Sequence, residues 1–156
     1  MQRINPEAVD PTVKNYHWLD LVCGLYEAYD RGGETVILID REGNVVEGPG
    51  FNVFAVKDGV ISTPSRGVLE GITRKTVFEL ASEHGILLEA RRVPAGEVRR
   101  ADEAFLTSTA GGIMPVTRVD GEPVGAGAPG PVTLRLRDAY WELHRDPRFA
   151  TPVRYY

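Results

Sequence analysis

The sequence lacks three features that would narrow its class at once: paired cysteines, a long apolar run and an excess of one charge. A single cysteine in 156 residues excludes an internal disulfide and a cysteine metal cluster. No apolar run approaches the ~20 residues of a membrane helix, and residues 1–6 lack a signal-peptide stretch. The net charge of −4 comes with scattered basic residues. We therefore expect a cytoplasmic protein that binds neither nucleic acid nor a membrane.

Length and composition predict one domain over residues 1–156. A chain of this size can bury roughly two thirds of the surface that its unfolded form exposes. No internal repeat, low-complexity tract or break in composition marks a second domain. The histidines, His17, His84 and His144, lie far apart without metal-ligand spacing, so no metal site is predicted.

Apolar residues at three- and four-residue spacing predict a first helix that follows Lys14 and ends at Gly32-Gly33. Its apolar face comprises Trp18, Leu21, Val22, Leu25, Tyr26 and Tyr29. Cys23 lies beside this face and is expected to be a buried small hydrophobe.

Two further helices are predicted later in the chain. One covers residues 74–84, with Thr73 as its N-cap and Gly85 as a left-handed residue after its end. The other begins at Pro131, a residue suited to a first helical turn, and ends before Pro147.

Runs rich in β-branched residues predict strands through the middle of the chain. An Asp-Gly turn at residues 58–59 predicts a hairpin. The predicted strands are residues 35–40, 43–46, 52–56, 60–63, 86–93, 101–107 and 113–119. The expected fold class is α/β (α+β), a mixed β-sheet or pseudo-barrel flanked by helices.

Lys14 follows the Asp-Pro-Thr-Val motif of residues 10–13 and precedes the first helix. A lysine amine condenses with a carbonyl only when neutral, so a catalytic lysine needs burial or nearby positive charge to lower its pKa. The alternative is a solvated lysine before a helix. Trp18, one helical turn later, is a candidate wall of a substrate pocket, with core packing as its alternative.

Glu47 ends a predicted strand and precedes the tight turn Gly48-Pro49-Gly50. Glycines in such a turn let the backbone approach a flat ligand closely. A carboxylate here can pair with a protonated ring nitrogen and keep the ring electron-withdrawing. The alternative is an ordinary acidic residue in a turn.

Two segments have the character of anion-binding sites. Gly71-Ile72-Thr73 leads into a helix, where free N–H groups and the helix dipole favour a phosphate. Residues 108–112, Ser-Thr-Ala-Gly-Gly, follow a strand and offer two hydroxyls with backbone donors. The alternatives are a capped helix and an ordinary loop.

In this order the motifs resemble the C-terminal large domain of the fold type IV, pyridoxal-phosphate-dependent class IV aminotransferases, up to about Tyr140. The resemblance implies the D-amino-acid aminotransferase-like fold and pyridoxal 5′-phosphate as cofactor. In that family the lysine matching Lys14 forms the internal aldimine and shuttles a proton, and the acid matching Glu47 pairs with the pyridine nitrogen. The expected cofactor-binding residues are Lys14, Glu47, Leu69, Gly71, Ile72, Thr73, Ser108 and Thr109. The expected substrate pocket contains Trp18, Phe51 and Ala110.

Within the family, residues 10–15, 47–52, 66–69 and 109–115 look most like (R)-selective amine transaminases, and the chain also resembles branched-chain aminotransferases. Branched-chain enzymes usually carry an acid where this chain has Phe51. The aromatic side chain makes the pocket wall less polar, which favours a hydrophobic amine.

The resemblance implies a transaminase that moves an amino group between a primary amine or amino acid and a keto acid. Alternatives are an aminodeoxychorismate lyase-type enzyme and a non-catalytic scaffold. Family members form homodimers and have a smaller N-terminal domain, which supplies part of the pocket. We expect that domain to be absent from this chain, and the chain alone to have little or no activity, because substrate positioning would be incomplete.

Overall fold

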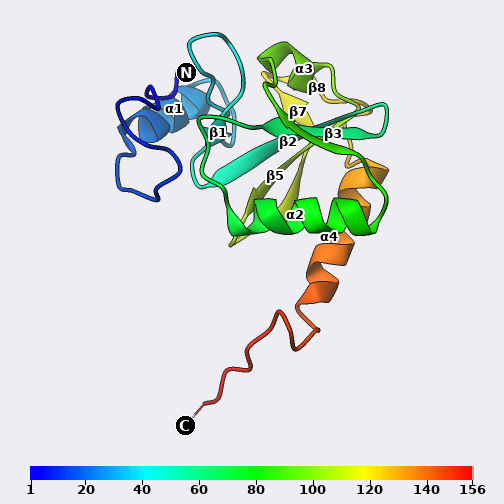
Figure 1. Cartoon of the computed structure of the whole chain (residues 1–156). Helices are drawn as coiled ribbons and strands as arrows, with labels where there is room; N and C mark the ends of the chain where they lie inside the picture. The colour runs from blue at the N-terminus through cyan, green and yellow to red at the C-terminus, as the bar shows by residue number, and fades with distance from the viewer. Residues whose placement is uncertain (156) are drawn as a thin grey trace.

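A mixed six-stranded sheet forms the centre of the computed structural model, which describes residues 1–155 (Figure 1). The strands are β1 (Glu47–Gly48), β2 (Phe51–Lys57), β3 (Val60–Pro64), β4 (Leu88–Arg91), β5 (Glu103–Ser108) and β6 (Gly112–Val116). They follow the order β4-β3-β2-β5-β6, with β1 paired to β2. Only β3 and β4 run parallel. The predicted fold class is therefore confirmed.

The hairpin between β2 and β3 forms as predicted. Asp58 and Gly59 both have positive φ, 49° and 79°, as a two-residue turn matched to strand twist requires. Residues 52–56 of β2 are all buried, because both faces of the central strands are covered.

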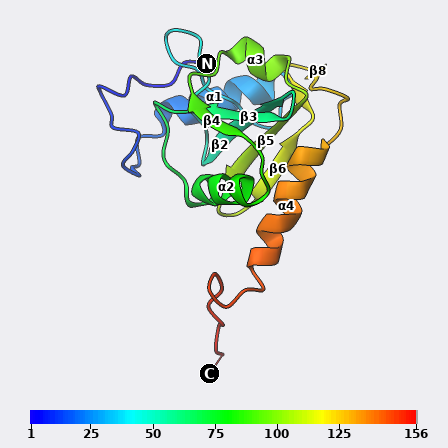
Figure 2. The same ribbon diagram turned by 45° about the vertical axis from the view of Figure 1, so that its right-hand side comes forward.

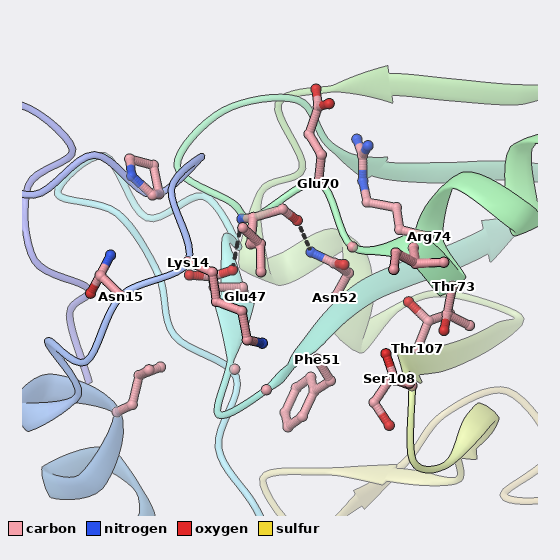
Figure 3. Close-up of a pocket in the computed structure, with 18 of the residues that line it drawn as sticks. Lys14, Asn15, Glu47, Phe51, Asn52, Glu70, Thr73, Arg74, Thr107 and Ser108 are labelled. Atoms are coloured by element: carbon pink, nitrogen blue, oxygen red, sulfur yellow. Dashed lines mark hydrogen bonds between the residues drawn. The ribbon is translucent and has the colours of Figure 1, made fainter.

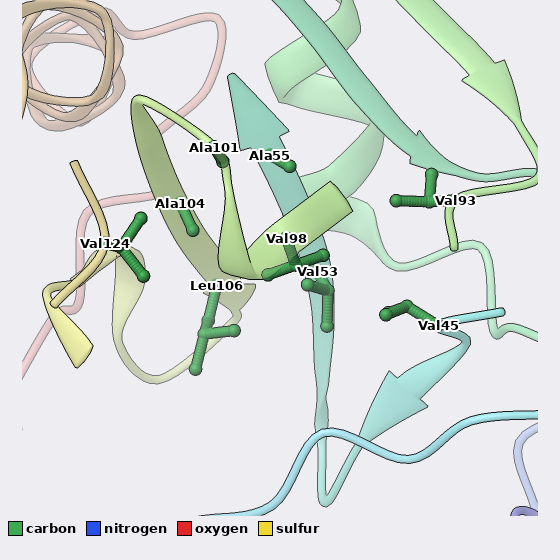
Figure 4. Close-up of a cluster of buried hydrophobic side chains, with 9 residues drawn as sticks. All are labelled: Val45, Val53, Ala55, Val93, Val98, Ala101, Ala104, Leu106 and Val124. Carbon is green, nitrogen blue, oxygen red and sulfur yellow. The ribbon is translucent and has the colours of Figure 1, made fainter. Parts of the chain in front are cut away.

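Helices cover the two faces of the sheet. α2 (Ile72–Glu83) and α4 (Pro131–Leu143) lie on one face, and the short α3 (Ala95–Arg99) lies on the other (Figures 1 and 2). Successive side chains of β2 point to opposite faces of the sheet, so alternate residues pack against the helices on each face. Phe54 packs with α2 and α4 and stacks on Phe105, their ring centroids 4.7 Å apart. Val53 packs in the opposite cluster with Val98 of α3 (Figure 4).

The first predicted helix forms as α1 (Leu19–Asp30), but much of its predicted apolar face is exposed. Its buried residues are Leu21, Gly24 and Ala28. A Cβ added at Gly24 would lie 3.1 Å from the side chain of Leu38, so this close approach selects the buried face. Cys23 is consequently exposed, and the prediction that it is buried is wrong.

Several predicted strands and caps differ in the structure. Residues 35–40 and 43–46 share backbone hydrogen bonds, but they form isolated bridges such as Ile39 to Val45 instead of strands. The predicted strand 113–119 divides into β6 and β7 (Arg118–Val119), and β7 pairs with β8 (Glu122–Pro123). The turn at Asp120 and Gly121, both with positive φ, folds this second hairpin back.

α2 begins two residues earlier than predicted, at Ile72 instead of Arg74. Gly71, not Thr73, is the N-cap, and no side chain caps the helix. Thr73 is instead a buried residue of the first turn. Gly85 has the predicted left-handed conformation, with φ of 66°. Pro131 opens α4 as predicted. Within residues 1–155, none of the helices is both long enough and apolar enough to cross a bilayer.

Candidate functional site

A pocket of about 260 Å³ lies where β1, the start of β2, the N-terminus of α2 and the end of β5 meet residues 11–18 (Figure 3). Every predicted site residue except Ala110 lines it. Ala110 is exposed in the turn between β5 and β6. Segments far apart in the sequence therefore converge on one cavity, although their assigned roles stay predictions.

Glu47 lies in β1 and is only 7% exposed. Its Oε1 accepts hydrogen bonds from Nε and Nη2 of Arg3, at 3.2 and 3.1 Å. Its Oε2 accepts one from the backbone N–H of Leu69, at 2.9 Å. Burial raises the pKa of the Glu47 carboxyl, while the Leu69 N–H and the Arg3 guanidinium act in the opposite direction. Oε2 keeps acceptor capacity for a further donor in the pocket.

Arg3 and Asp20 belong to the site, and sequence analysis did not identify them. Arg3 Nη1 donates to both carboxylate oxygens of Asp20, at 2.8 and 2.6 Å. The backbone N–H groups of Ile4 and Leu21 also donate to Asp20, at 2.6 and 2.9 Å. Burial acts to raise the pKa of Asp20, but these hydrogen bonds and the Arg3 charge hold it below its ordinary value. No motif spacing pointed to either residue, because the contacts join remote parts of the chain.

The N-terminus of α2 forms another side of the pocket. The first N–H groups of a helix have no partner within it and carry the positive end of the dipole. Gly71 has no room for a side chain, since an added Cβ would lie 2.5 Å from Oδ1 of Asn52. Asn52 Nδ2 in turn donates to the carbonyl of Leu69, at 2.7 Å. These contacts fix the backbone that presents the helix N-terminus to the pocket.

Two buried polar atoms in this part of the pocket have no hydrogen-bond partner within residues 1–155: Oγ1 of Thr107 and Nε of Arg74. A buried polar group without a hydrogen-bond partner costs free energy, so such groups indicate a position where a ligand or a water molecule binds. Thr73 is buried beside them in the first turn of α2. Together these donors favour an anion.

The predicted second anion-binding segment is partly occupied by its own contacts. The Ser108 hydroxyl accepts a hydrogen bond from the N–H of Gly111, at 2.9 Å. That donor is therefore engaged in the turn. Thr109 is exposed at the rim of the pocket.

We call residues 10–18 the lysine segment. Lys14 is exposed, and its amine points into the pocket toward Phe51 (Figure 3). Local hydrogen bonds shape the segment: Thr12 Oγ1 donates to Asp10 Oδ1 at 2.7 Å, and the N–H of His17 donates to Asn15 Oδ1 at 2.8 Å. No residue of the segment is buried, so its position depends on short-range contacts.

Apolar side chains give the pocket flat walls. Phe51 is half-buried and packs closely over Gly48, where a side chain would collide with its ring. Leu69 and Trp18 also line the cavity. A planar ligand with a basic nitrogen and an anionic group would therefore find a carboxylate, apolar faces and an anion site.

The chain is similar to known proteins over most of its length. A family model described as Amino-transferase class IV matches residues 1–119. The branched-chain-amino-acid aminotransferase of Pseudomonas aeruginosa is 45% identical over 130 residues, which cover 83% of this chain and 42% of that protein. The D-alanine aminotransferase of Bacillus licheniformis is 39% identical over 129 residues, covering 81% of this chain and 45% of that protein.

Solved structures are similar over nearly the whole chain. The branched-chain amino acid aminotransferase from Thermobaculum terrenum, in its PLP-bound form, matches with a TM-score of 0.89 and 40% identity. The match covers 95% of this chain and 50% of that one. The chain thus spans about half the length of the relatives that it matches.

Proposed function

This chain belongs to the class IV aminotransferases, and from that premise we propose that its pocket holds pyridoxal 5′-phosphate for amino-group transfer between a primary amine or amino acid and a keto acid. One observation carries the proposal. A buried carboxylate, a lysine amine and a helix N-terminus with unpartnered polar atoms beside it all line a single cavity.

The residues present fit this cofactor. Oε2 of Glu47 has a free acceptor position for a protonated ring nitrogen. The N–H groups at Ile72 and Thr73, together with the unpartnered Thr107 hydroxyl, suit a phosphate. Leu69 and Phe51 offer apolar faces to a flat ring.

When bound, the cofactor supplies an aldehyde that takes up an amino group and a ring that withdraws electrons from the neighbouring carbon. Lys14 Nζ would hold the aldehyde covalently and, once displaced by the substrate amine, remove and return a proton at the substrate carbon that carries nitrogen. Glu47 would hold the proton on the ring nitrogen. Ile72, Thr73 and Thr109 would bind the phosphate.

We propose an apolar amino donor, such as a branched-chain amino acid or a hydrophobic (R)-amine. Phe51 and Trp18 line the pocket near Lys14, and an apolar wall disfavours a charged side chain because it cannot replace the hydration of that charge. The similarity to branched-chain and D-alanine aminotransferases supports the same general class of substrate.

We further propose that residues outside this chain complete the pocket. The lysine segment is exposed on its outer side, and the relatives are about twice as long as the matched region. A smaller N-terminal domain and a homodimer partner are the contributors that the family resemblance implies. The cytoplasmic location stays a prediction.

The test is spectroscopic. The purified chain is mixed with pyridoxal phosphate, and the visible absorbance of the bound cofactor is followed while L-leucine, D-alanine or (R)-1-phenylethylamine is added. We expect an absorbance band that is lost in Lys14→Ala and kept in Lys57→Ala, whose exposed lysine pairs with Asp102 far from the pocket. A donor-dependent loss of the band with release of the keto product, slow because the pocket of the chain alone is incomplete, supports transamination. Pyruvate release from aminodeoxychorismate without a keto acid would favour the lyase, and no band at all would contradict cofactor binding.

A further inference from the structure

We propose that Arg3 is a positioning residue for Glu47: anchored by Asp20, its guanidinium keeps the Glu47 carboxylate ionised and aimed at the cofactor ring. The identity of the ring rests on the proposed function. The link between Arg3 and Glu47 is a property of the chain itself and can be tested without cofactor.

A chain of charged side chains with low exposure runs from Asp20 in the first turn of α1, through Arg3, to Glu47 in β1. The side chains of Arg3, Asp20 and Glu47 are 8%, 13% and 9% exposed. One edge of the guanidinium donates two hydrogen bonds to Glu47 Oε1, and its Nη1 donates two more to Asp20. Arginine's planar fork suits this double engagement, which a lysine ammonium cannot reproduce.

The charge balance favours a cation at the open side of Glu47. Two carboxylates and one guanidinium leave a single net negative charge on side chains that are 8–13% exposed. A protonated ring nitrogen would neutralise that charge. Without Arg3, the buried Glu47 carboxylate and the partly buried Asp20 carboxylate would lie near each other with no cation between them, which raises the pKa of both.

Arg3 also determines which oxygen of the Glu47 carboxylate can accept a further hydrogen bond from a ligand. Among the described residues, the hydrogen bonds to the Glu47 carboxylate come from Arg3 at Oε1 and from Leu69 at Oε2. Other charged groups that line the pocket are Lys14, Glu70 and Arg74, and none of them bonds to Glu47. Arg3 is thus the cation that sets both the charge and the orientation of this carboxylate.

The test measures Glu47 directly in the cofactor-free chain, by NMR titration of glutamate labelled with ¹³C at the side-chain carboxyl. The unaltered chain is compared with Arg3→Gln, with Arg3→Lys, and with Arg31→Gln as a control on an exposed arginine of an i,i+4 pair. We expect the midpoint of Glu47 to rise by about one pH unit or more in Arg3→Gln, to rise less in Arg3→Lys, and to stay unchanged in the control. An unchanged midpoint in folded Arg3→Gln would overturn the proposal.

A second measurement covers the case in which Arg3→Gln does not fold. The double variant Arg3→Gln/Glu47→Gln removes the carboxylate that the first change leaves unpaired. We expect the double variant to fold and to be more stable than Arg3→Gln alone. A double variant that also fails to fold, or that is no more stable than Arg3→Gln, would contradict the proposal. Failure of the unaltered chain to bind pyridoxal phosphate would count against the proposed function while leaving these results intact.

Discussion

The two sides of the pocket are built in different ways. On the anchor side, by which we mean Glu47, Asn52, Thr73 and Thr107, every side chain is buried and belongs to a strand or to the first turn of α2. On the other side, the lysine segment has no buried residue, and Tyr16 is fully exposed. The fold thus preorganises the groups that would bind a cofactor, whereas the position of the Lys14 amine depends on local turns. Changes on the anchor side should therefore affect folding, and changes in the lysine segment should affect chemistry alone.

The largest expected effect is in the sheet that supports the anchor side. Phe54→Ala removes a fully buried ring that stacks on Phe105, and it should lower the free energy of unfolding by about 3–5 kcal/mol. Urea denaturation measures this loss. Tyr16→Ala, in the lysine segment, is the matched aromatic truncation and should change stability by less than about 0.5 kcal/mol. Equal losses of stability in the two variants would contradict the claim that the anchor side is part of the folded core and the lysine segment is not.

Asp20, in the first turn of α1, is connected to Glu47 of the anchor side through Arg3, and its effect should depend on pH. Asp20→Asn removes charged hydrogen bonds and should cost about 1.5–3 kcal/mol at neutral pH. Because the pKa of Asp20 is lower in the folded chain, its contribution is fully present above its ordinary value of 3.8 and is lost as pH falls through the lower folded value.

The stability gap between the unaltered chain and Asp20→Asn should therefore be widest above pH 3.8 and shrink at more acidic pH. Thermal unfolding across this range measures the gap. Glu47 has a raised pKa and acts in the opposite sense, but it is present in both proteins and largely cancels. A gap that is constant with pH would show that Asp20 does not act through its charge.

Gly71→Ala tests the backbone that presents the helix N-terminus. The added Cβ would lie 2.5 Å from Asn52 Oδ1, so either Asn52 or the start of α2 must shift. We expect a loss of about 1–3 kcal/mol in stability together with weaker binding of inorganic phosphate. Ser82→Ala, an exposed position of the same helix, is the control. Unchanged phosphate binding in Gly71→Ala would show that the anion site does not lie at the N-terminus of α2.

The smallest effect on stability is expected within the lysine segment. Asn15→Ala removes the side-chain bonds to the carbonyl of Val13 and the N–H of His17, at 2.8 Å each. Stability should change by no more than about 0.5 kcal/mol, while the rate at which Lys14 captures pyridoxal phosphate should fall. Stopped-flow absorbance measures that rate. A strong loss of stability instead would show that the segment is integrated into the fold.

The same contrast explains what the sequence could predict. The start of α4 at Pro131 and the hairpin turn at Asp58 and Gly59 depend on neighbours in the chain, so local patterns were sufficient to predict them. Arg3 was missed because its partners lie 17 and 44 residues away. The burial of Cys23 was wrong because the buried face of α1 is selected by the contact of Gly24 with Leu38, which periodicity alone does not reveal.

The sequence placed its candidate site residues in short motifs, and every one of them except Ala110 lines one pocket, while their assigned roles stay predictions. The strands outside the central sheet were predicted less well. Residues 35–40 have strong strand character but pair through isolated bridges, because their neighbours in space are the N-terminus and residues 44–47 rather than a full strand. Such pairings depend on tertiary contacts that no local pattern records.

The most direct measurement of the central claim is to mix the chain with pyridoxal phosphate, reduce it with borohydride and locate the label by peptide mass. A pyridoxyl group on Lys14, absent from Lys14→Ala, is the predicted result. A label on another lysine, or no label at all, would contradict the account.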